Sequence, residues 1–194
     1  MALLLSLLAA LAAFSCCPGG SLGCNLPPDD VPLSRENFQL LDQMRTSAFF
    51  CQEDRKNFRF PGEMLQGSLS QKAQAMSVLK EMLWQTFLLF CTEQSSAAWN
   101  QTLLKELQAG LYSQWEELRG CLVEETGEED SALSVERPTQ AVKRYFTGIR
   151  LYLKGKKHSD CAWKVVTVEV TRPFSLPIWK EKLSMKDGDL GSPR

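Results

Sequence analysis

The sequence predicts an all-α fold in which four amphipathic helices form an up-up-down-down bundle and a fifth helix lies in the second crossover. Apolar residues recur at the spacing of one helix face along most of residues 34–171. Such faces are stable only when they are buried on one another. The connection after the first helix is about 20 residues long and can return the next helix in the parallel direction, whereas short later connections favour antiparallel neighbours.

The first helix begins at Ser34, whose side chain can cap it. Its apolar face consists of Phe38, Leu41, Met44 and Ala48. Residues 49–70 have no sustained period and contain a proline and two glycines, which favour irregular backbone. We therefore expect one long loop there.

A second helix is expected from about Ser70 to Cys91, and the pair Ser95-Ser96 is expected to break the helical path. The apolar face of this helix consists of Ala73, Met76, Leu79, Met82, Leu83, Thr86, Phe87 and Phe90. A third helix is expected from about Ala97. Its apolar face consists of Trp99, Leu103, Leu107, Leu111, Trp115, Leu118 and Leu122.

The fourth helix follows an acidic stretch, residues 124–130, whose composition predicts a solvated loop. Pro138 suits the first turn of a helix, because a helix start does not use that backbone N–H. The apolar face consists of Val142, Tyr145, Phe146, Ile149, Tyr152 and Leu153. The charged segment "KGKKHSD" should end this helix.

The fifth helix can be capped by Ser159 or Asp160. Pro173 should stop or kink it, because a proline inside a helix loses a hydrogen bond and clashes one turn back. The β-branched run at residues 165–168 leaves a strand as the local alternative, although the cap favours a helix. Residues 186–194 are expected to form a frayed tail.

The first 23 residues have the pattern of a secretory signal peptide. The apolar segment "LLLSLLAALAAF" is shorter than the ~20 residues that a membrane helix needs. Small residues at Ser21 and Gly23 predict cleavage after Gly23, so the mature domain would be residues 24–194. This segment has no Lys or Arg, so a buried N-terminal helix remains the alternative.

Composition and motifs argue against several classes of protein. The formal net charge of −1 lacks the bulk basicity of a nucleic-acid binder. The single histidine, His158, lies in a charged turn, and no C-x-x-C pair, P-loop or G-x-S-x-G is present. We therefore expect no enzyme activity, no cofactor and no metal site.

A secreted mature chain would keep five cysteines: Cys24, Cys51, Cys91, Cys121 and Cys161. Thiols in an oxidising compartment usually pair, and an odd number leaves one over. Spacing alone leaves the pairing open.

Several segments together carry a resemblance to a known family. "SLGCNLP", "EDRKNFRFP", "SSAAWNQTLL", "KRYFTGIRLYLK" and "SDCAW" resemble the type I interferons, and the "DGDLGSP" tail is similar to the omega, tau and delta-like subtypes. The resemblance implies a long-chain helical cytokine that is secreted as a monomer. It also implies an antiviral cytokine that bridges two receptor chains at the cell surface and triggers kinase-linked signalling and antiviral gene induction, without membrane insertion or nucleic-acid binding.

The resemblance also implies two disulfide bonds, Cys24 with Cys121 and Cys51 with Cys161. Cys91 is then left over, either as a half-buried free thiol or as a partner for another molecule.

Receptor-binding positions transfer where the sequence matches the family. For the high-affinity receptor chain these are Arg55, Arg172 and Leu176, and for the weaker chain they are Phe87, Thr92, Leu103 and Tyr112. Core packing is an equal alternative for Phe87 and Leu103, and Arg55 could be an ordinary solvated charge. Gln52, Thr167 and Thr171 depart from the usual apolar, arginine and methionine side chains.

Asn100 lies in "WNQT", which meets the N-x-Thr rule for glycosylation in a secreted chain. A helix starting near Ala97 would rotate Asn100 about 100° away from Trp99 and toward water. A different function also stays open: a secreted helical bundle could carry a lipid or another small hydrophobic ligand.

Overall fold

The computed structural model describes residues 33–45, 51–126 and 132–184. These residues form helices and connections, with no strand among them. The helices are α2 (Arg35–Arg45), η2 (Gln52–Asp54), α3 (Gly62–Ser68), α4 (Lys72–Phe90), α5 (Glu93–Ala98), α6 (Gln101–Thr126), α7 (Ala132–Gly155), α8 (Asp160–Thr171), η3 (Arg172–Ser175) and α9 (Pro177–Leu183). The predicted signal peptide and the 186–194 tail lie outside the described residues.

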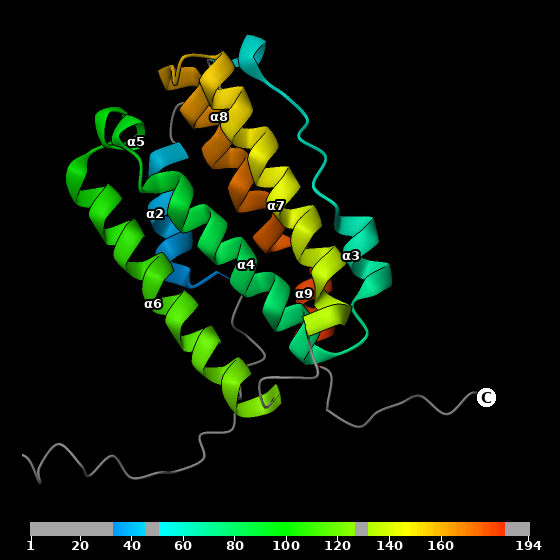
Figure 1. Ribbon diagram of the computed structural model, residues 1–194. Coiled ribbons are helices and arrows are strands. Elements are labelled where there is room, and N and C mark those ends of the chain that lie inside the picture. The colour runs from blue at the N-terminus through cyan, green and yellow to red at the C-terminus, as the bar shows by residue number, and fades with distance from the viewer. Residues whose placement is uncertain (1–32, 46–50, 127–131, 185–194) are drawn as a thin grey trace, which may run out of the picture.

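The long helices have the predicted directions. Figure 1 shows α2, α4 and α7 running toward the end of the bundle where α8 begins, and α6 and α8 running back. α4 packs against α6 and α7, and α2 packs against α6 and α8. The all-α prediction is confirmed, with α7 in the second crossover of an up-up-down-down bundle.

The core is built from the apolar faces of these helices. Its largest fully buried side chains are Trp163, Trp179, Phe90, Phe146 and Phe174. Most of the predicted apolar positions of α4 and α7 are buried, while Phe87 is half-buried. In α6 the buried residue of the first turn is Leu104, and Leu103 is half-buried.

Gly110 allows α2 and α6 to cross closely. A Cβ atom at this position would overlap the side-chain amide of Asn37, which is 1% exposed. The glycine in the middle of α6 therefore has a packing reason that outweighs its poor helix propensity.

The predicted long loop, residues 49–70, contains two short helices, η2 and α3. α3 is only seven residues long, about two turns, which is too short for the repeated apolar pattern that identifies a helix in a sequence. Leu65 and Leu69, both buried, fix this segment on the core.

The prediction that Ser95 and Ser96 break the chain path is wrong, because both lie inside α5. Thr92 caps α5: its Oγ1 accepts a hydrogen bond from the Ser95 N–H at 3.1 Å, and the Ser95 hydroxyl returns a bond to the Phe90 carbonyl at 2.6 Å. The breaks lie instead at Cys91-Thr92 and at Trp99-Asn100. Serine thus acts here through capping geometry.

The third helix also begins later than predicted, at Gln101. Asn100 precedes it, and its Oδ1 accepts hydrogen bonds from the N–H groups of Thr102 at 2.9 Å and Leu103 at 3.3 Å. Trp99 is therefore not part of the helix, and the predicted rotation between Trp99 and Asn100 does not apply. Asn100 is nevertheless exposed.

The fourth helix begins six residues earlier than predicted, since α7 starts at Ala132 and contains Pro138. A proline in the second turn removes one backbone hydrogen bond, which a helix of 24 residues tolerates. The last helix behaves as expected: Ser159 caps α8, the 165–168 run is helical, and α8 ends at Thr171 before Pro173.

The chain continues through η3 into α9 after α8 ends, which the sequence did not predict. The indole N–H of Trp179 donates a hydrogen bond to the Pro173 carbonyl at 2.7 Å. Ile178 and Trp179 are buried. The proline that ends α8 therefore turns a further short helix onto the core.

Candidate functional site

Five of the seven residues predicted for receptor binding fall on two regions. We call the first the arginine face, which consists of residues 51–61 together with α8, η3 and Leu176, and which carries Arg55 and Arg172. We call the second the aromatic face, which consists of Trp84 and Phe87 of α4 and Tyr112 and Trp115 of α6. Figure 1 shows residues 51–61 running along α7 on the side away from α6.

A disulfide bond anchors the start of the arginine face. Cys51 and Cys161 are joined with an S–S distance of 2.03 Å and a Cα–Cα distance of 5.3 Å, as the resemblance implies. The bond ties residues 110 positions apart and fixes the loop to the start of α8. Cys121 is also disulfide-bonded. Cys24 lies outside the described residues, so the Cys24–Cys121 pairing stays a prediction.

Asp54, the residue directly before Arg55, is held by neighbours from α7 and the turn after it. The Tyr152 hydroxyl donates a hydrogen bond to the Asp54 carbonyl oxygen at 2.6 Å. The Lys156 ammonium lies 2.7 Å from the Asp54 carboxylate, and this hydrogen bond raises the pKa of Lys156. Burial raises the pKa of Tyr152, so its hydroxyl remains a donor. Arg55 itself is exposed, and so its side chain is free to reach a partner.

Lys56, which follows Arg55, is held by aromatic rings. Its ammonium lies 5.6 Å from the ring centre of Phe58 and 5.7 Å from that of Tyr152. The two rings meet edge to face with their centres 5.1 Å apart. Cation–π contacts of this kind hold a charged loop residue in place without a second charge.

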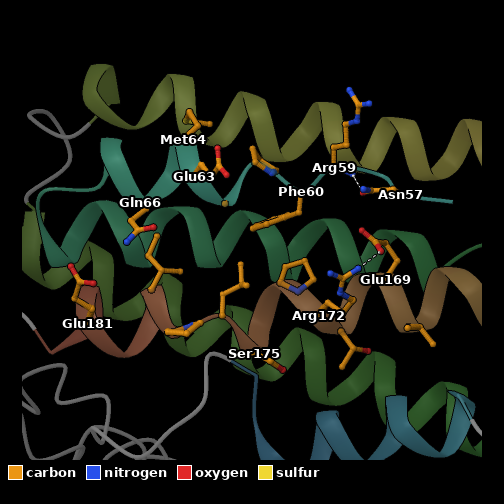
Figure 2. A pocket seen from close by; sticks show the side chains of 18 of the residues that line it. Asn57, Arg59, Phe60, Glu63, Met64, Gln66, Glu169, Arg172, Ser175 and Glu181 are labelled. Atoms are coloured by element: carbon orange, nitrogen blue, oxygen red, sulfur yellow. Dashed lines mark hydrogen bonds and ion pairs between the residues drawn. The ribbon is translucent and has the colours of Figure 1, made fainter.

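A groove of about 1010 Å³ lies between residues 57–66 and the segment from α8 to α9. Figure 2 shows Phe60 and Glu63 on one side of it, with Glu169 and Arg172 on the other. Arg172 and Leu176 both line the groove, whereas Arg55 does not. Leu176 is half-buried, and Arg172 has 73% of its side chain exposed. The groove therefore combines an apolar floor with charges at its edge.

Three residues on this face, Gln52, Thr167 and Thr171, depart from the family pattern, and two of them are buried and cannot contact a receptor. Thr167 and Thr171 are buried, and their hydroxyls donate to the Trp163 carbonyl at 3.0 Å and to the Thr167 carbonyl at 2.7 Å. An arginine at position 167 would bury a charge. Gln52 is exposed on η2, so this part of the face presents a polar side chain where an apolar one is usual.

The aromatic face is a cluster of aromatic rings in contact with one another on the surface of α4 and α6. The ring centre of Trp84 lies 5.3 Å from that of Phe87 and 4.8 Å from that of Trp115. The ring centre of Tyr112 lies 5.7 Å from that of Phe87 and 5.8 Å from that of Trp115. Tyr112 is 44% exposed. The structure thus brings together Phe87 and Tyr112, which are 25 residues apart in the printed sequence.

A polar edge borders these rings. Arg119 lies with its guanidinium carbon 5.6 Å from the Trp115 ring centre and pairs with Glu116 at 2.7 Å. Glu116 also accepts a hydrogen bond from the Tyr112 hydroxyl at 3.2 Å. The hydrogen bond from Arg119 lowers the pKa of Glu116, so its carboxylate stays charged. These contacts limit the rotamers of both Tyr112 and Trp115.

Trp84 and Trp115 were not among the predicted receptor residues. Aromatic side chains three residues apart on two helices, 84 with 87 and 112 with 115, were the signal in the sequence that could have found them. Thr92 and Leu103 have other surroundings. Thr92 caps α5 and Leu103 is half-buried in the first turn of α6.

Two further residues singled out in the sequence, Cys91 and His158, are not among the predicted receptor residues. Cys91 is a free thiol, but it is exposed and not half-buried as expected; desolvation by the protein atoms beside it still raises its pKa. His158 is half-buried, with its ring 6.2 Å from that of Trp163. Among the described residues, no group of three or more potential ligand side chains could hold a metal ion. In the same part of the chain, no helix has the length and apolar character to cross a membrane.

Comparison with known proteins gives the same family. The interferon alpha/beta domain matches residues 26–179. The chain is 58% identical to interferon omega-2 of Equus caballus over 195 residues, covering 100% of both chains. It is 54% identical to interferon omega-1 of Homo sapiens over 194 residues, covering 99% of this chain and 100% of that one. It is 51% identical to interferon tau of Cervus elaphus over 195 residues, covering 100% of both.

Interferons are cytokines and not enzymes. The helical bundle, the Cys51–Cys161 disulfide and these matches lead to one conclusion. The chain belongs to the type I interferon family, close to the omega and tau interferons.

Proposed function

We propose that the chain is secreted after removal of residues 1–23 and acts as a monomeric antiviral cytokine that bridges the two chains of the type I interferon receptor. Membership of the family supports receptor binding. The observation that carries bridging is the separation of the two faces. One is built on the first loop with α8 and η3, and the other on α4 and α6. A molecule with two separate contact faces can hold two receptor chains at once.

The arginine face binds the high-affinity chain. Arg55 and Arg172 are exposed, and arginine is enriched among the few residues that dominate binding energy at interfaces. Leu176 and the groove beside it supply apolar area. The disulfide and the hydrogen bonds from α7 hold the loop before binding, so less conformational entropy is lost on association.

The aromatic face binds the second, weaker chain. Its rings present a wide apolar surface with a polar edge, the composition typical of interface centres. Phe87 and Tyr112 belong to it directly. Thr92 and Leu103 lie near the turn through α5 and contribute to this contact at its edge.

The test uses purified extracellular domains of each receptor chain and cells that carry both, either or neither. We expect binding to each domain and induction of antiviral genes at low concentration only in cells with both chains. Signalling in cells that lack one chain would contradict bridging. Co-purified lipid without signalling would instead support a carrier.

A further inference from the structure

α7 carries two buried tyrosines, Tyr145 and Tyr152, whose hydroxyls both reach toward the arginine face. They are seven residues apart, which is about two helical turns, so they lie on the same side of the helix. Tyr145 is 6% exposed and Tyr152 is 7% exposed. Neither ring can therefore form a substantial contact with a receptor.

Tyr145 acts on the segment that carries Arg172. Its hydroxyl lies 2.9 Å from Oε1 of Glu169 and 3.2 Å from the Glu169 carbonyl. The other carboxylate oxygen of Glu169 lies 3.6 Å from Nη1 of Arg172, and Figure 2 shows this pair at the groove. Burial and the neighbouring Glu169 hold the pKa of Tyr145 far above its usual value, so the phenol remains a donor.

Glu169 is 7% exposed, and a buried carboxylate needs partners. Tyr145 supplies one hydrogen bond from inside the protein, which leaves Oε2 directed to the exposed arginine. The order Tyr145, Glu169, Arg172 therefore runs from the core to the groove edge.

Tyr152 acts in the same way on the segment that carries Arg55. Its hydroxyl donates to the carbonyl of Asp54, the residue directly before Arg55. Lys156 holds the carboxylate of Asp54 from the outside. The same helix thus fixes the neighbours of both arginines.

We propose that Tyr145 and Tyr152 are positioning residues that set the relative placement of Arg172 and Arg55 for the high-affinity receptor chain. This inference rests on the proposed function. The rise of a helix separates the two tyrosines by about 10 Å, so α7 defines the spacing between the two anchor points. A fixed spacing reduces the ordering that binding requires.

The test is a pair of double-mutant cycles. Tyr145→Phe and Tyr152→Phe each remove one hydroxyl and keep the ring. Each is combined with Arg172→Ala and with Arg55→Ala, and the Kd for the high-affinity extracellular domain is measured. Each single tyrosine variant is expected to weaken binding about three- to tenfold, the range that one lost hydrogen bond produces.

The cycles separate positioning from general destabilisation. The effect of Tyr145→Phe should disappear in the Arg172→Ala background and persist with Arg55→Ala, and the reverse should hold for Tyr152→Phe. Each tyrosine variant thus controls for the other. Equal loss in all backgrounds would overturn the inference. Unchanged binding of both single arginine variants would contradict the proposed arginine contact itself, which is a different result.

A second pair of variants covers poor folding of the tyrosine variants. Glu169→Gln keeps an acceptor for Tyr145 but removes the charge that faces Arg172, and Lys156→Ala releases Asp54. Both variants should weaken binding. The effect of Glu169→Gln should disappear in the Arg172→Ala background, and the effect of Lys156→Ala should disappear in the Arg55→Ala background. Absence of both dependences would also overturn the inference.

Discussion

The arginine face and the aromatic face hold their side chains in different ways. The arginine face depends on links between distant parts of the chain: a disulfide across 110 residues and a tyrosine hydrogen bond across 98. The aromatic face depends on two adjacent regular helices whose rings pack against each other at a tilt. The first face should therefore fail when one link is cut, and the second when one ring is removed.

The largest expected effect comes from cutting the disulfide. Replacing Cys51 and Cys161 together with serine should lower the free energy of unfolding by about 2–5 kcal/mol, because a long closed loop is released in the unfolded chain. It should also weaken binding to the high-affinity receptor chain more than to the second chain. Denaturant unfolding and separate binding measurements check both. An equal loss on the two chains would remove the distinction between the faces.

Gly110→Ala is the matched control for destabilisation, because Gly110 belongs to neither face. Its new Cβ atom would overlap Asn37, and overpacking of this kind costs about 1–3 kcal/mol. The ratio of the two receptor affinities should stay unchanged. A changed ratio would mean that stability alone alters the balance between the chains.

The next effect concerns Arg55. Arg55→Ala should weaken binding to the high-affinity chain by roughly tenfold or more, as loss of an interface arginine commonly does, and leave the second chain unaffected. Arg59→Ala is the comparison variant, since it removes a second exposed charge from the same loop on the same face. Equal losses for the two variants would show that only the general charge of the loop matters.

A smaller effect is expected on the aromatic face. Trp115→Ala removes a ring that contacts Trp84, Tyr112 and Arg119, and it should weaken binding to the second chain by about tenfold. Tyr112→Phe removes only a hydroxyl bonded to Glu116 and should change little. If both variants behaved alike, the cluster of rings would not be the source of affinity.

The smallest effect concerns Asn100, which lies on neither face. We predict that it carries a glycan in material from animal cells, since its cap uses Oδ1 and the sugar attaches to the amide nitrogen. Thr102→Ala should remove the glycan and keep the cap. Asn100→Gln should remove both and lower stability by a further ~0.5–2 kcal/mol.

Mass measurement and thermal unfolding of these two variants separate the glycan from the cap. Both should run at the same lower mass, both should signal, and Asn100→Gln should melt at the lower temperature. Identical melting would show that the cap has no energetic role. An unchanged mass after glycosidase treatment would contradict glycosylation.

The fold was largely predictable because its long helices repeat their apolar residues over several turns. The short helices α3, α5 and α9 were not, since fewer than two full turns cannot repeat an apolar pattern often enough to identify a helix. Buried residues such as Trp179 stabilise these short helices only in the folded state. Because the start of α6 was predicted too early, Leu103 was expected in the core, whereas the structure buries Leu104 instead.

The candidate site was predictable only where the resemblance marked it. Arg55 and Tyr112 could be nominated in this way. The hydrogen bond that holds the backbone before Arg55 could not, because Tyr152 and Asp54 are 98 residues apart and no local pattern joins them. The Trp84 and Trp115 rings meet across two helices, so their contact depends on helix packing.

The most direct test of the two-face account is an order-of-addition binding measurement. The protein is first saturated with the extracellular domain of the high-affinity chain, and the domain of the second chain is then titrated in solution. We expect a complex of one copy of each domain with the protein, with Arg55→Ala weakening the first step and Trp115→Ala weakening the second. Competition between the two domains for the protein would contradict the two-face account.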